Sequence, residues 1–218
     1  MTEPHYAEHF QEFAAEPVTL GPMASDTWRR DPKRLGFMLA RYKFVAHHMK
    51  GFGRVAEIGC GDGMGAVLVR DAVAYLSLYD FDDTFLAAAV KDHTGRVCQF
   101  DISGFNPLPA DPYNGIYMLD VIEHIRPELE PKVMRNIVRS LKPDGVFIVG
   151  CPSLESQQYA SSISRAGHVN CRNGDVLRDD MRKYFSNVFL FGMNDETLHT
   201  GFASMCHYLL AICTGPKR

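Results

Sequence analysis

The amino-acid sequence predicts an α/β protein built on a mostly parallel sheet with helices on both faces. From residue 54 onwards, short apolar runs of strand length alternate with segments of helical periodicity, which is the pattern of strands joined by crossover helices. A glycine-rich turn follows the first run, at a place where open parallel sheets bind ligands. The last two runs are joined by a short link without helical periodicity, so we expect an antiparallel hairpin there.

The N-terminal region differs from the rest of the chain. Residues 1–33 contain four prolines among polar and aromatic residues and show no clear periodicity, which indicates an arm or lid of short irregular pieces. Trp28 in this region is expected to pack against the body of the protein. Asp31 and Pro32 then form a helix start signal, and the helix that follows is expected to end before Gly51. We therefore predict an arm at 1–33 and one domain at 34–218.

The remaining elements follow in order along the chain. Apolar runs predict strands at 54–59, 74–80, 96–102, 114–121, 145–152, 187–194 and 205–213. Helical periodicity predicts helices at 63–72, 82–93, 126–141 and 174–185. The polar tract at 151–175 is long, and long links in compact domains are usually functional. The expected sheet thus has seven strands, with a candidate lid after the fifth.

Composition excludes several classes of protein. The chain has 218 residues, 46% of them hydrophobic and 22% charged, with a net charge of −3, so a nucleic-acid partner is not expected. No apolar stretch approaches the roughly 18–20 residues that span a bilayer, and the N-terminus lacks a signal-peptide core. The six cysteines form no CxxC pair. We therefore expect a reduced, cytoplasmic protein.

The stretch "VAEIGCGDG" at 55–63 carries the strongest functional signal. Gly59, Gly61 and Gly63 permit backbone conformations that let a ligand approach the main chain closely. Their spacing does not match the GxGxxG pattern of dinucleotide sites. Glu57, two residues before the first glycine, is unfavourable for a pyrophosphate but tolerates a cationic ligand such as the sulfonium and ammonium groups of S-adenosylmethionine.

The segment "EIGCGDG" resembles the first motif of class I S-adenosylmethionine-dependent methyltransferases, and the similarity continues in order over about residues 35–213. The resemblance implies their Rossmann-like fold. It also implies that Asp80 accepts hydrogen bonds from the ribose, that Phe81 stacks on the adenine, and that Asp101 accepts from the adenine amino group. The full set of implied cofactor contacts is Glu57, Gly59, Gly61, Asp80, Phe81, Asp101, Ile102 and Leu119. Arg41 and Tyr42 on the preceding helix are further candidates, for the methionine carboxylate, unless they serve only the fold.

Two histidines are the candidates for acceptor chemistry. His124 lies in "LDVIEHI" after the fourth predicted strand, and His168 lies in the polar tract after the fifth. Methyl transfer requires an acceptor that is held in line and relieved of its proton, and a histidine with a near-neutral pKa suits that role. We predict that His124 and His168 serve as the catalytic base.

A metal-assisted alternative arises from the same segment. Asp120, Glu123 and His124, together with His168, resemble the ExxEH…H site of small-RNA 2′-O-methyltransferases and ubiquinone-biosynthesis O-methyltransferases, which holds a divalent ion. This resemblance implies a metal such as Mg²⁺ that lowers the pKa of the acceptor hydroxyl. The sequence departs from the pattern at its first position, where Asp120 replaces glutamate. Metal-free base catalysis and a purely structural role for these residues remain open.

The acceptor class is indicated mainly by absent motifs. No NPPY-like or DPPY-like tetrapeptide follows the fourth predicted strand, which argues against amino methylation of DNA or of protein glutamine. A hydroxyl on a small molecule or a sugar-bearing metabolite fits best. The competing hypotheses are a regulatory protein that binds S-adenosylmethionine without turnover and a nicotinamide-dependent oxidoreductase.

Overall fold

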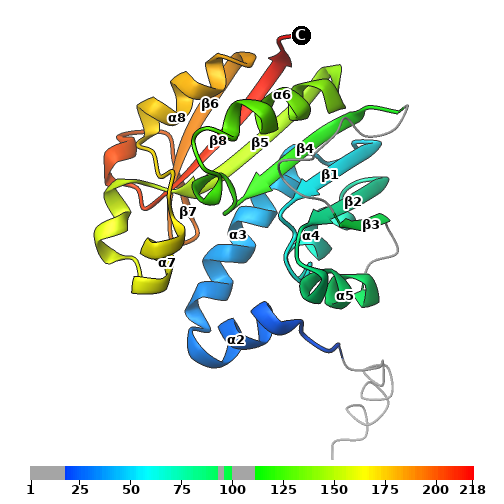
Figure 1. Ribbon diagram of the computed structural model, residues 1–218, viewed down its shortest axis with the longest axis vertical. Helices are drawn as coiled ribbons and strands as arrows, with labels where there is room; N and C mark the ends of the chain where they lie inside the picture. The colour runs from blue at the N-terminus through cyan, green and yellow to red at the C-terminus, as the bar shows by residue number, and fades with distance from the viewer. Residues whose placement is uncertain (1–17, 93–95, 100–110) are drawn as a thin grey trace, which may run out of the picture.

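The structure of the protein is a computed structural model that describes residues 18–92, 96–99 and 111–218 (Figure 1). Its centre is an eight-stranded sheet in the order β3-β2-β1-β4-β5-β8-β6-β7. The strands are β1 (Arg54–Ile58), β2 (Tyr75–Asp80), β3 (Arg96–Gln99), β4 (Tyr113–Leu119), β5 (Leu141–Pro152), β6 (Phe185–Asn194), β7 (Thr197–His199) and β8 (Tyr208–Pro216). The first five strands pair in parallel, whereas β8 is antiparallel to both β5 and β6. The predicted α/β class and the C-terminal antiparallel strands are confirmed.

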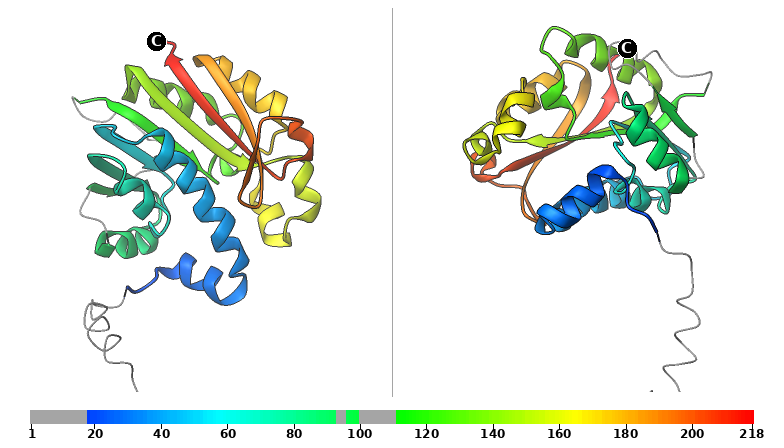
Figure 2. Two further views of the ribbon diagram at one scale, coloured as in Figure 1. Left: turned by 180° about the vertical axis from the view of Figure 1, so that it is seen from behind. Right: turned by 60° about the horizontal axis from the view of Figure 1, so that its bottom comes forward.

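Helices cover both faces of the sheet (Figure 2). The α-helices are α2 (Pro22–Arg30), α3 (Lys33–His48), α4 (Ala66–Arg70), α5 (Asp83–Asp92), α6 (Glu130–Ser140), α7 (Ser162–Gly167) and α8 (Gly174–Arg182). Short 3₁₀ helices are η2 (Ile122–His124), η3 (Glu155–Tyr159) and η4 (Ala203–Met205). Among the helices of the described residues, none has the length and apolar composition that a membrane crossing requires.

Two hydrophobic cores lie on opposite faces of the sheet because side chains alternate along each strand. In β4, Ile116 and Met118 pack with α6 and α8 on one face. Tyr117 and Leu119 of the same strand pack with α3, α4 and α5 on the other face. A sheet buried on both faces is the expected result of crossover helices, and it brings the carboxyl ends of β1, β2 and β4 to one edge.

Several details differ from the sequence prediction. The sheet has an eighth strand, because β7 pairs with the end of β6 over three residues. The region before residue 33 contains the regular helix α2, and Trp28 on it is 61% exposed rather than packed against the body. The helix predicted from residue 126 begins at Glu130. Strand β5 begins at Leu141, and the "KPDG" segment that we expected as a turn forms an irregularity in its pairing with β4.

The helix α2 is attached to the glycine-rich turn. The backbone amide of Ala24, in the first turn of α2, donates a 2.8 Å hydrogen bond to Asp62 Oδ2. This contact satisfies one of the amides that a helix N-terminus leaves free. The predicted division into an arm at 1–33 and a domain at 34–218 stays a prediction. Asp101 and Ile102, two of the predicted cofactor contacts, lie outside the described residues.

Candidate functional site

The glycine-rich turn after β1 adopts the left-handed backbone that its sequence predicts. Gly59, Gly61 and Gly63 have φ angles of +77°, +54° and +76°. The amide of Gly59 donates to the carbonyl oxygen of Tyr79 at 2.7 Å, which fixes the start of the turn against β2. A side chain on Gly59 would also overlap the Cγ2 methyl of Val121. The turn is therefore restricted to glycine by both backbone conformation and space.

Asp80, at the end of β2, holds the turn from the opposite side. Its Oδ2 accepts a 2.8 Å hydrogen bond from the amide of Gly61. Its Oδ1 accepts from the amides of Phe81 and Asp82 at 2.8 and 3.1 Å. The residue is only 6% exposed but contributes to the wall of a cavity. Asp80 thus lies where the sequence predicted, with its carboxylate oriented by three backbone amides.

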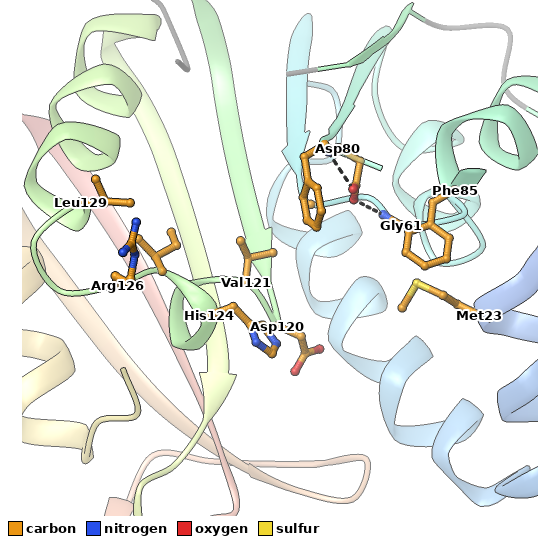
Figure 3. Close-up of a pocket in the computed structure, with 12 residues that line it drawn as sticks. Met23, Gly61, Asp80, Phe85, Asp120, Val121, His124, Arg126 and Leu129 are labelled. Atoms are coloured by element: carbon orange, nitrogen blue, oxygen red, sulfur yellow. Dashed lines mark hydrogen bonds between the residues drawn. The ribbon is translucent and has the colours of Figure 1, made fainter. Parts of the chain in front are cut away.

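Two adjoining cavities meet at the glycine-rich turn. Residues that line the larger of the two are drawn in Figure 3. The larger, of about 750 Å³, extends from Asp80 to the segment after β4. The smaller, of about 470 Å³, lies between the turn and helices α2 and α3. The residues that line both cavities are Met23, Gly59, Gly61, Phe85 and Asp120. In Figure 3, His124 and Asp120 lie between Asp80, Gly61 and Phe85 on one side and Arg126 and Leu129 on the other.

Phe81, Leu119 and Glu57, three of the predicted cofactor contacts, differ in burial and in their position relative to the cavities. Phe81 lines the larger cavity and is 70% exposed, so its ring is available to a ligand. Leu119 is buried and lines the smaller cavity. Glu57 is fully buried beneath the turn, where its two oxygens accept 2.7 Å hydrogen bonds from the hydroxyls of Tyr42 and Tyr117. Burial raises the pKa of Glu57 to about 7 despite those two bonds.

Arg41 binds Asp120 rather than pointing to an open part of the cavity. Its Nη1 donates to Oδ1 and Oδ2 of Asp120 at 3.0 and 2.8 Å. The guanidinium lies 3.5 Å from the centre of the Tyr208 ring and 5.2 Å from that of Phe37. Asp120 has a φ of +55°, which is uncommon for a residue with a side chain. The contact of Arg41 with the methionine carboxylate stays a prediction, and in this structure the guanidinium already binds the Asp120 carboxylate.

The two predicted catalytic histidines are neighbours, with ring centres 4.9 Å apart. His124 Nδ1 lies 2.9 Å from the carbonyl oxygen of Gly167, and His168 Nδ1 lies 2.8 Å from Gln157 Oε1. Because an oxygen of this kind only accepts, each Nδ1 carries the hydrogen and each neutral ring keeps its lone pair on Nε2. Burial and the nearby His124 lower the pKa of His168. A neutral base is thus available on this side of the site.

Hydrogen bonds between distant segments bring the histidines together. The amides of Val169 and Asn170 both donate to the carbonyl oxygen of Glu123, at 2.9 and 3.0 Å. Asn170 Nδ2 also donates to the Ile125 carbonyl and to Glu130. Arg172, which is buried, binds Glu130 and Asp180 and so anchors the end of this segment. No spacing pattern in the sequence identified Asn170 or Arg172, because Glu130, the partner that they share, lies 40 and 42 residues away.

The predicted metal ligands converge only in part. Glu123, His124 and His168 can each offer one atom, and these three atoms lie within 4.8 Å of one another. Asp120, the fourth predicted ligand, is absent from this group and pairs with Arg41. Glu123 is 1% exposed, and burial, with a contribution from Asp120, raises its pKa well above the usual range. Burial therefore disfavours the charged form of this carboxyl group.

Comparison with known proteins identifies relatives of this arrangement. A sequence model described as a methyltransferase domain matches residues 27–186. A probable S-adenosylmethionine-dependent methyltransferase of Mycolicibacterium smegmatis is 32% identical over 116 residues, which is 51% of this chain and 42% of that protein. An uncharacterized methyltransferase of Staphylococcus carnosus is 23% identical over 66% of this chain and 60% of that protein. The chain thus spans about half the length of these curated relatives.

Two solved structures share the fold. A methyltransferase from Thermotoga maritima has a TM-score of 0.65 at 18% identity, over 85% of this chain and 95% of that one. The N-methyltransferase NodS from Bradyrhizobium japonicum, in complex with S-adenosylhomocysteine, has a TM-score of 0.59 at 15% identity, over 99% of this chain and 100% of that one. At these identities the likeness concerns the fold alone.

Proposed function

This chain belongs to the methyltransferase domain family, and on that premise we propose that it transfers a methyl group from S-adenosylmethionine to the oxygen of a small-molecule or sugar-type hydroxyl. The observation that carries the proposal is the pair of imidazoles, each with an Nε2 lone pair. His124 lines the cavity that begins at the glycine-rich turn, and the ring centre of His168 lies 4.9 Å from that of His124. Two sites with separate tasks, cofactor binding and proton removal, thus adjoin one another.

The cofactor side fits S-adenosylmethionine on structural grounds. The positive φ of Gly61 opens a cradle, and a Cβ there would lie 2.9 Å from Met23 Sδ. Asp80 offers carboxylate oxygens to the ribose hydroxyls, and the exposed Phe81 offers an apolar face to the adenine. When bound, S-adenosylmethionine supplies a methyl group on a positively charged sulfur. Leu119 and the buried Glu57, Tyr42 and Tyr117 support the floor beneath this position.

The proposed role of the histidines is to accept the acceptor's proton. His168 is neutral at pH 7 because its pKa lies below its ordinary value. His124 is fixed by Gly167 so that Nε2 faces away from that bond. A positioned base of this kind contributes roughly 10²–10⁴ in rate. We therefore assign removal of the acceptor's proton to the imidazoles of His168 and His124.

The charge of the site favours a hydroxyl over a charged amine. Asp120 is compensated by Arg41, and burial raises the pKa of Glu123 well above its usual range, which disfavours its charged form. Neither carboxyl beside the histidines therefore offers an uncompensated negative charge to an ammonium group. A neutral hydroxyl needs only a hydrogen-bond acceptor, which Nε2 of either histidine provides. This argument supports oxygen as the acceptor atom, although NodS, which shares the fold, is an N-methyltransferase.

The test is transfer of a labelled methyl group from S-adenosylmethionine into a fractionated metabolite extract of the source cells. One arm is treated with a chelator, and a second is treated and then resupplied with Mg²⁺. We expect label in a small-molecule fraction in all arms. Label that disappears with chelator and returns with Mg²⁺ would favour the metal-assisted alternative at Glu123, His124 and His168. Binding of S-adenosylhomocysteine without any label would favour a regulatory protein.

We also propose that the protein acts in a reducing, cytoplasmic compartment. Its six cysteines are all free, and four of them are buried. A protein that matures in an oxidising compartment usually pairs such residues. The expected partners are the cofactor and a small-molecule acceptor rather than nucleic acid. A nicotinamide oxidoreductase, our other alternative, is not supported by the family match, and a fluorescence titration with NADH would test it.

A further inference from the structure

The ion pair between Arg41 and Asp120 stands at the junction of the two cavities. Both residues line the smaller cavity, and Asp120 lines the larger one as well. Arg41 is 6% exposed, and its guanidinium lies against the faces of Tyr208 and Phe37. A buried cation is retained only where a carboxylate and aromatic faces compensate its lost hydration. This guanidinium is therefore a fixed positive charge built into the site.

The backbone of Asp120 is also constrained. Its φ of +55° is in the left-handed region, which is unfavourable for most residues with a side chain. The amide of Asp120 donates a 2.9 Å hydrogen bond to the Gly150 carbonyl on β5. Such a conformation persists only where its surroundings enforce it. Here β5 fixes the main chain and Arg41 fixes the carboxylate, so the carboxylate has a single orientation.

The donors available for a Mg²⁺ ion do not fit that metal. Mg²⁺ requires oxygen ligands in near-octahedral geometry, and carboxylates are its usual protein ligands. With Asp120 held by Arg41 through both oxygens, the remaining carboxyl group is Glu123, whose side chain is 1% exposed. The other two converging donors are imidazole nitrogens. The four-ligand site that the sequence resemblance implied is thus incomplete. Its fourth ligand would be the Asp120 carboxylate, which is bound to the guanidinium of Arg41.

We propose that Arg41 takes the place of a divalent cation at this site, as a positioning residue that neutralises Asp120 and fixes its orientation beside His124. Arg41 and Asp120 are 79 residues apart in the sequence, so only the folded chain brings the guanidinium to the carboxylate. The inference rests on the proposed function of the site. Its test measures metal binding, however, and its outcome does not depend on whether methyl transfer is detected.

The test uses Mn²⁺ as the probe. Mn²⁺ is titrated into a solution of the protein, and the fraction of free ion is measured by electron paramagnetic resonance. In Arg41→Met, an unbranched apolar side chain of similar length replaces the cation, so that Asp120 becomes an available ligand beside Glu123, His124 and His168. We expect Arg41→Met to bind Mn²⁺ at least tenfold more tightly than the original protein. Arg41→Lys keeps the positive charge and is expected to bind as weakly as the original.

Two further variants separate coordination from general electrostatics. In the double variant Arg41→Met, Asp120→Asn, the gain in Mn²⁺ affinity should disappear. In the otherwise unchanged protein, Asp120→Asn should leave Mn²⁺ affinity within about twofold, because Asp120 is already occupied. This measurement also keeps the inference testable if Arg41→Met fails to fold. Loss of Mn²⁺ binding on Asp120→Asn alone, or equal Mn²⁺ affinities for Arg41→Met and the original protein, would overturn the proposal.

Discussion

The glycine-rich turn and the histidine pair, which lie on the two sides of the cavities, are held by different kinds of contact. The turn is fixed through its own backbone amides: that of Gly61 donates to the side chain of Asp80, 19 residues away, and that of Gly59 donates to the carbonyl oxygen of Tyr79. The histidines are fixed by partners from segments far apart in sequence, such as His124 and Gly167, which are separated by 43 residues. The cofactor side is therefore readable from a short motif, whereas the acceptor side requires the whole fold.

The largest effect is expected from Gly59→Ala, which challenges the backbone side of this comparison. The new methyl group would adopt an unfavourable φ of +77° and overlap Val121. We expect loss of measurable S-adenosylhomocysteine binding and a loss of stability on the order of 2–4 kcal/mol. Thermal unfolding and the fluorescence of Trp28, the single tryptophan, measure the two effects.

A matched variant separates the two causes. Gly59→Ala combined with Val121→Ala removes the overlap but keeps the unfavourable φ. We expect it to recover only part of the lost stability. Full recovery of stability and binding would mean that the backbone conformation of Gly59 is unimportant, contrary to the description above.

The next largest effect is expected on the acceptor side, from His168→Ala. If His168 accepts the acceptor's proton, turnover should fall by about 10²-fold or more, while cofactor affinity stays unchanged. The label-transfer rate and Trp28 fluorescence report these two quantities separately. His47→Ala, at an exposed position on α3 that lines neither cavity, is the control. Equal turnover of His168→Ala and the original protein would remove the proposed base.

A smaller effect is expected from Asp80→Ala, and it should fall on cofactor affinity, which His168→Ala should leave unchanged. This change removes the acceptor for three backbone amides and the proposed ribose contact. Cofactor affinity should fall by roughly tenfold to a hundredfold, in line with about 1.5–3 kcal/mol for hydrogen bonds to a charged group. Asp83→Ala, at an exposed position on α5, should change it little. Normal cofactor binding by Asp80→Ala would contradict the assignment at the end of β2.

The smallest effect is expected from pH. The pKa of His168 is lowered from its ordinary value of 6.5, so the histidine stays neutral at pH 7 and gains its proton only in more acidic solution. Turnover should therefore be level near neutral pH and should fall below about pH 6.5. The same shift means that protonation favours the unfolded chain, so stability contributed by neutral His168 is lost as pH falls. A rate that rises on acidification would contradict a neutral histidine base.

Much of the fold could be predicted because its signals are local. Continuous apolar runs and segments of helical period specified the strands and most helices, and the glycines marked the turn at the end of β1. The misses were of two kinds. The strand β7 is only three residues long, and it exists because it pairs with β6. The helix α2 has an N-terminus next to Asp62, a contact that no local pattern reveals.

The sequence alone determined the chemistry that is available: the glycine-rich turn, the acidic residue after β2 and the two histidines. The tertiary structure decided which groups meet. It placed Glu57 against Tyr42 and Tyr117, and it paired Arg41 with Asp120 across 79 residues. Backbone conformation depends on neighbouring residues and can therefore be predicted from the local sequence. An ion pair or a protonation state depends on burial and on partners that only the folded chain brings together.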